Sequence, residues 1–110
     1  MQPLKVIKDS DNKTVIGLNI SDFVNARVLA ASTAETITVP KAARYIIISG
    51  NADLWVDVGK TSVVPAADIT NGSSPFLVTG GTKELRSLGE VTHISVISVQ
   101  ACIATAEFYA

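Results

Sequence analysis

The residue types that catalyse most hydrolytic and redox reactions are scarce in this chain. It has one histidine, His93, and one cysteine, Cys102, among 110 residues. A catalytic histidine needs a nucleophile and an orienting acid beside it. Because the fold brings such partners together, the sequence around His93 does not identify them. We interpret His93 as a hydrogen-bonded residue on a strand. Cys102 lies in an apolar run with no basic residue nearby to activate the thiol, so we predict a small buried hydrophobic residue.

Acidic residues near the N-terminus resemble the opening of a calcium-binding loop. Asp9 and Asp11 have the spacing of the first two ligands of an EF-hand, and Asn12 follows them. Such a loop continues with glycine at its sixth position and glutamate at its twelfth, where this chain has Thr14 and Ile20. The run therefore predicts a hairpin turn, and we expect neither a metal nor a cofactor.

Trp55 is flanked by two acids, Asp53 and Asp57, on one face of a predicted strand. Carboxylates four residues apart on a strand are about 13 Å from each other, beyond the ~5–10 Å of a glycosidase pair. Trp55 has three open interpretations: stacking on a sugar ring, anchoring a subunit interface, or burial beneath the segment Gly59–Gly81. With no catalytic set in the sequence, we expect a protein that is not an enzyme.

The composition indicates the elements that position these residues. Val, Ile and Thr make up 34 of the 110 residues, and β-branched side chains favour strands. Turn signals at short intervals separate the apolar runs. The predicted strands are Leu4–Lys8, Thr14–Leu18, Arg27–Ala31, Thr36–Val39, Arg44–Ser49, Ala52–Val58, Phe76–Thr79, Thr92–Gln100 and Ile103–Tyr109, with a short edge strand or turn near Arg86.

Two connections between these strands carry specific predictions. Gly50 and Asn51 predict a hairpin that pairs Arg44–Ser49 with Ala52–Val58. Ser21 and Asp22 predict the cap of one short helical turn over residues 23–26.

The strand count predicts the fold class. About eight to ten strands with almost no helix indicate an all-β, single-domain antiparallel β-sandwich or barrel of jelly-roll-like form over residues 1–110. Residues 1–26 are expected to add an N-terminal arm or an extra hairpin.

The charge distribution and the lengths of the apolar runs indicate which classes of binding partner to expect. Nine basic and ten acidic residues give a net charge of −1, and the basic residues are spread along the chain. We therefore expect that the protein does not bind nucleic acid. No apolar run reaches the ~20 residues that span a bilayer, so we expect no membrane association. Residues 1–6 lack the apolar region of a signal peptide, so we expect a chain made in the cytoplasm. Charged residues are 17% of the chain, below the ~25% typical of soluble domains. This composition is compatible with two surfaces: an apolar exterior covered by a partner, or the Thr- and Ser-coated surface of a monomer.

Three runs, Thr36–Gly59, Gly72–Val78 and Thr92–Ser98, together resemble small structural proteins of tailed-phage virions. The shared pattern is a strand ending in Val-Pro, a strand ending in Ser-Gly-Asn, an aromatic-bearing return strand, a Gly/Pro loop and an Ile-Ser-Val-Ile-Ser strand. The resemblance covers roughly residues 27–109. It implies a jelly-roll-like decoration (cement or staple) protein on the outer surface of a virion capsid, made in a host bacterial cytoplasm, with the major capsid protein as its partner.

A protein of this kind would act through contact surfaces and would need no catalytic residues. We expect residues 1–13 and Gly59–Gly81 to make the contacts, and we also expect self-association as a homo-oligomer. The candidate interface residues are Leu4, Val6, Asp53, Trp55, Asp57 and Phe76. Two alternatives remain: a low-copy neck or tail component of the virion, and a carbohydrate-binding β-sandwich that uses Trp55 and its flanking acids.

Overall fold

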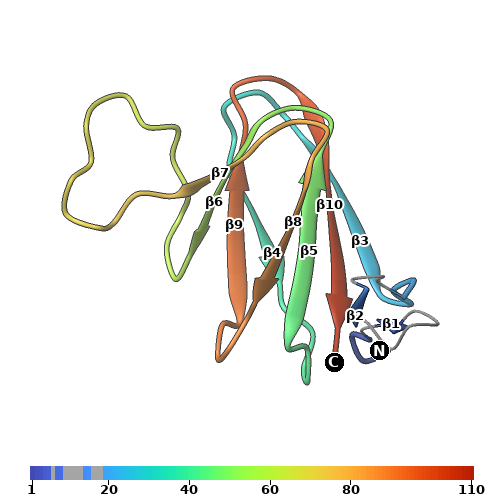
Figure 1. Ribbon diagram of the computed structural model, residues 1–110. Helices are drawn as coiled ribbons and strands as arrows, with labels where there is room; N and C mark the ends of the chain where they lie inside the picture. The colour runs from blue at the N-terminus through green and yellow to red at the C-terminus, as the bar shows by residue number, and fades with distance from the viewer. Residues whose placement is uncertain (6, 9–13, 16–18) are drawn as a thin grey trace.

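Eight strands form two four-stranded antiparallel sheets that pack face to face (Figure 1). The computed structural model describes residues 1–5, 7–8, 14–15 and 19–110. The first sheet has the order β3 (Val24–Leu29), β10 (Cys102–Tyr109), β5 (Tyr45–Gly50) and β8 (Lys83–Ser87). The second sheet has the order β4 (Glu35–Thr38), β9 (His93–Ile97), β6 (Leu54–Val58) and β7 (Phe76–Val78).

The strand order confirms an all-β, jelly-roll-like sandwich and excludes the barrel alternative. Each step from β3 through β4 and β5 to β6 moves the chain to the other sheet, so sequence neighbours face each other across the core. Each sheet keeps two edge strands: β3 and β8 in the first, β4 and β7 in the second. The strand predictions in the sandwich hold with shifted ends, and the segment near Arg86 is the edge strand β8. Residues 6 and 16–18 of the first two predicted strands lie outside the described residues.

The core lies between the sheets, on the inward face of each strand. Ala104, Ala106 and Phe108 of β10 are fully buried, whereas Thr105 and Glu107 between them are only partly buried. This is the period-two alternation expected of a strand with one covered face. Phe108 meets Phe23 edge to face, with ring centroids 6.1 Å apart. Cys102 is buried, as its apolar surroundings predict.

The hairpin predicted at Gly50 and Asn51 is wrong. β5 and β6 belong to different sheets, so the three residues between them carry the chain across the sandwich. Asn51 holds this corner on β10: its N–H donates to Ile103 O at 3.3 Å and its Oδ1 accepts from Ile103 N at 2.8 Å. The buried Ala52 and Leu54 then enter the core of the opposite sheet.

The helical turn predicted after Ser21 is also wrong. Ser21 Oγ donates to Phe108 O at 2.7 Å and accepts from Phe23 N at 3.1 Å, which directs the chain into strand β3 instead of a helix. The described residues contain no helix that is long and apolar enough to cross a membrane.

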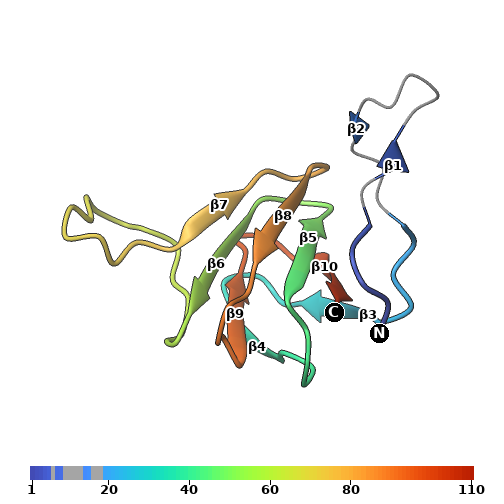
Figure 2. The same cartoon turned by 60° about the horizontal axis from the view of Figure 1, so that its bottom comes forward.

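The N-terminal residues form a separate two-stranded antiparallel sheet beside the end of the sandwich (Figure 2). β1 (Ile7–Lys8) pairs with β2 (Thr14–Val15), so the strands on either side of the predicted hairpin turn are paired. The predicted turn over residues 9–13 lies outside the described residues. The base of the segment is tied to the sandwich, because Tyr109 Oη donates to Asn19 O at 2.6 Å and Ala110 N donates to Gln2 O at 2.9 Å.

Candidate functional site

Trp55 lies on the outward face of the second sheet. In the ladder it is opposite Leu77 of β7 and Ile97 of β9, so its neighbours on this face are apolar. The residue is half-buried, and its carbonyl accepts a hydrogen bond of 2.8 Å from Ser62 Oγ. The segment after β6 therefore runs close to the Trp55 backbone.

The two acids beside Trp55 bind backbone groups of neighbouring turns. Asp53 Oδ1 accepts from Gly80 N at 2.7 Å, which joins the start of β6 to the end of β7. Asp57 is buried; its Oδ1 accepts from Val58 N at 2.8 Å and its Oδ2 lies 3.7 Å from Lys60 Nζ. That Oδ2 atom is buried and accepts no hydrogen bond from the described residues, and the nearby charge of Lys60 offsets its loss of water.

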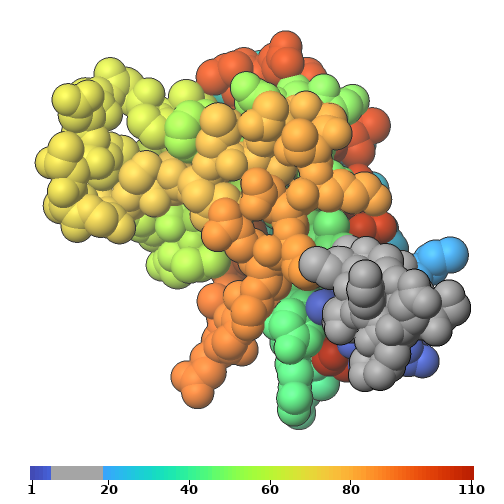
Figure 3. Space-filling model, viewed as in Figure 1, coloured from blue at the N-terminus to red at the C-terminus, as the bar shows by residue number. Residues whose placement is uncertain are grey.

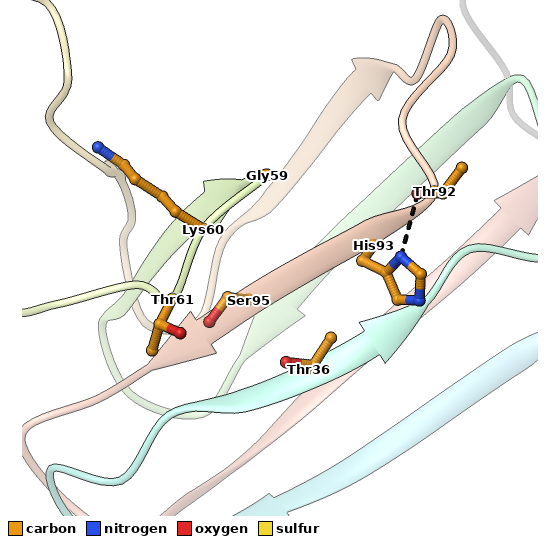
Figure 4. Close-up of a pocket in the computed structure, with 7 residues that line it drawn as sticks. All are labelled: Thr36, Gly59, Lys60, Thr61, Thr92, His93 and Ser95. Carbon is orange, nitrogen blue, oxygen red and sulfur yellow. Dashed lines mark hydrogen bonds between the residues drawn. The ribbon is translucent and has the colours of Figure 1, made fainter.

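A polar groove of about 420 Å³ lies on the outward face of the second sheet (Figure 4). Its floor is formed by Thr36 of β4 and by His93 and Ser95 of β9, and its wall by Gly59–Thr61 and Thr92. The Lys60 side chain extends away from the other labelled residues, and its ammonium donates to Ser73 O at 2.6 Å.

Two polar side chains on the floor of this groove, those of His93 and Ser95, already have partners. His93 Nδ1 lies 3.0 Å from Thr92 Oγ1, in agreement with the hydrogen-bonded strand histidine that we predicted. Ser95 Oγ accepts from Ser62 N at 2.9 Å, so this hydroxyl holds the segment after β6 on the sheet. Across the part of the chain that the structure describes, no three His, Cys, Asp or Glu side chains cluster as metal ligands would. The groove presents hydroxyl groups and one imidazole to solvent.

Phe76 covers the open side of the sandwich between β7 and β8. The guanidinium carbon of Arg86, on β8, lies 4.6 Å from the centroid of the Phe76 ring, a cation–π geometry. Behind this pair is an apolar cavity of about 210 Å³ between the sheets, lined in part by Ile48, Val56 and Ile94. Phe76 is half-buried, and its ring helps to close the core.

The remaining predicted interface residues lie near the N-terminus. Leu4 is half-buried in the segment that Asn19 holds: Asn19 Oδ1 accepts from Lys5 N at 3.1 Å, and its Nδ2 donates to Pro3 O at 2.9 Å. Val6 lies outside the described residues.

A further apolar surface, which our sequence analysis missed, lies on the outward face of the first sheet, along β3 and the adjacent part of β10. Val28 of β3 is 77% exposed and lies opposite Ile103 of β10, which is 45% exposed. Val24, at the start of β3, is 49% exposed. The signal was the alternation from Val24 to Val28. Our assignment of residues 23–26 to a helical turn divided that pattern.

Comparisons with protein-family models, with curated proteins and with solved structures find no match to this chain.

Proposed function

We propose that this protein is a non-enzymatic structural protein that binds the outside of an assembled phage capsid and stabilises it. A decoration protein stabilises a shell because it binds the assembled state more tightly than the free subunits. The sequence resemblance to small virion proteins supports this role. The jelly-roll-like sandwich and the surfaces that it leaves free for a partner are compatible with it.

The main structural support for the proposal is the loop between β6 and β7, from Gly59 to Pro75. This loop extends from one side of the sandwich, apart from the rest of the molecule (Figure 3). Across these residues the only charged side chains are Lys60 and Asp68. Val63, near the base of the loop, is 51% exposed. A long, charge-poor loop of this kind is more typical of a binding element than of a connection.

The base of the loop is fixed, which reduces the entropy lost on binding. Ser62 is 1% exposed, and it bonds both Ser95 Oγ and Trp55 O. Lys60 Nζ reaches across to Ser73 O and joins the two ends of the loop. The projecting part is therefore presented from a rigid base.

Copy number in purified virus particles tests the proposal. Quantitative mass spectrometry of particles from the source lysate should find the chain in numbers comparable to the major shell protein. A few copies per particle would instead support a neck or tail component. Complete absence from particles would reject a virion role and leave the carbohydrate-binding interpretation of Trp55, which tryptophan fluorescence against a panel of glycans tests.

A further inference from the structure

The four edge strands of the sandwich differ in how well they are protected against pairing with another chain. β8 carries Lys83, Glu84 and Arg86, and charged residues on an edge oppose pairing. β7 has only three residues, between Pro75 and Gly80, and β4 has four. β3 is six residues long, has no proline, and carries a single charge, at Arg27.

The open side of β3 presents backbone groups that have no hydrogen-bond partner among the described residues. Phe108 N donates to Phe23 O at 2.9 Å, and this bond sets the phase of the β3–β10 ladder. Residues of an antiparallel strand direct their N–H and C=O groups alternately to the two sides. Val24, Ala26 and Val28 therefore direct theirs away from β10, to the side where no strand of the sheet lies.

The side chains of β3 are symmetric about Ala26. The strand reads Val24-Asn25-Ala26-Arg27-Val28, with the exposed valines at equal distances from the centre. In an antiparallel pair of two such strands centred on Ala26, Val24 lies opposite Val28 of the other copy and Asn25 lies opposite its Arg27. The three outward-directed residues are then the hydrogen-bonding positions.

Other two-fold centres on this strand are less favourable. A centre at Arg27 places two guanidinium groups directly opposite each other, and like charges in that position destabilise a strand pair. A centre at Asn25 places Val24 opposite Ala26 of the other copy and leaves Val28 without a valine partner. Arg27 can keep its contact with Glu35 Oε1, at 3.9 Å, on the inner side of the sheet.

We propose that two copies of this chain pair through β3, antiparallel and centred on Ala26, to form a continuous eight-stranded sheet. The partner is a second copy because this edge strand is complementary to itself: two antiparallel copies match in length, in charge and in the placement of the exposed valines. The pair makes six backbone hydrogen bonds and places the exposed valines against each other. This inference is independent of capsid binding, since it concerns the free protein in solution.

Sedimentation velocity over a wide concentration range tests the pairing. The wild-type mass should rise from 11.5 kDa toward twice that value. A26K places two ammonium groups opposite each other at the centre and should raise the dimer dissociation constant at least about tenfold. T105K is the matched control, because Thr105 is the β10 neighbour of Ala26 on the same face but not at the edge. A wild-type monomer at all concentrations, or equal effects of the two lysines, would overturn the proposal.

Disulfide trapping tests the register without the added charge. In a Cys102→Ala background, A26C should form a crosslinked dimer under mild oxidation, because opposite α-carbons about 5.5 Å apart suit a disulfide. V28C alone should not crosslink, since its two α-carbons would be about 14 Å apart. A mixture of V24C and V28C should crosslink. Efficient crosslinking of V28C alone, or none by A26C, would overturn the register.

Discussion

The side-chain hydroxyl of Tyr109 connects the sandwich to the N-terminal segment. Tyr109 is 2% exposed, and its hydroxyl donates to Asn19 O at 2.6 Å. Burial, together with the nearby charge of Glu107, raises the pKa of this hydroxyl above its ordinary value of 10.0. The folded state therefore holds the proton more tightly than the unfolded state does. The resulting stability is fully present below about pH 10 and is lost as the pH rises through the folded pKa.

Replacing Tyr109 should change how stability responds to alkaline pH. Y109F should lower the free energy of unfolding by about 1 kcal/mol at neutral pH, because the hydrogen bond to Asn19 is lost. It should also flatten the decline in stability above about pH 10. Urea unfolding at a series of pH values measures both effects. Y45F is the control, since Tyr45 is the β5 partner of Tyr109 in the ladder and its replacement leaves the Asn19 bond in place. An unchanged alkaline decline in Y109F would contradict this assignment.

At the scale of elements, local sequence predicts strands better than it predicts their partners. The alternation in Ala52–Val58 correctly indicated a strand with Trp55 and its flanking acids on one face; the structure shows that the other face, with Leu54 and Val56, is the buried one. The choice between a hairpin and a crossing at Gly50 depends on Ile103, more than fifty residues away, which binds Asn51. No local pattern contains that contact.

The candidate site shows the same limit. The sequence placed Trp55 and Phe76 on strands and marked the acids around Trp55. It did not indicate that Arg86 packs on Phe76, because those residues meet only across the open side of the sandwich. The pairing of Asp57 with Lys60 depends on how the chain turns after β6, so their spacing alone was insufficient.

At Gly80, just after β7, the chain passes close to the backbone of the corner between β5 and β6, so this position requires glycine. A Cβ atom at this position would lie 2.9 Å from both Cα and C of Ala52, which are backbone atoms that cannot rotate away. G80A should therefore lower the free energy of unfolding by about 1–3 kcal/mol. Urea denaturation measures the loss. T79A, at the exposed neighbouring position, should change stability by less than about 0.5 kcal/mol. Equal losses in the two variants would show that the close approach at Gly80 is tolerated.

At the scale of the whole molecule, the two proposed contact surfaces lie at opposite sides of the sandwich. β3 is at the side where Arg27 meets Glu35 of β4, and the Gly59–Pro75 loop extends from the side of β6 and β7 (Figure 1). Pairing through β3 would therefore leave the loop free. A dimer would present two loops, and two linked weak contacts bind a repeating lattice more tightly than either one alone.

Shortening the loop should separate particle binding from folding. Replacement of residues 64–71 by a shorter Gly-Ser linker keeps Lys60, Ser62 and Ser73, which fix the base of the loop. The free energy of unfolding should stay within about 0.5 kcal/mol of wild type, because the removed residues lie outside the core cluster. Affinity for purified capsids, measured by co-sedimentation, should fall at least about tenfold because the removed residues would contact the shell. V63S keeps the full length of the loop and is the matched control for the contribution of its most exposed large apolar side chain. Wild-type affinity in the shortened variant would show that capsids bind through another surface.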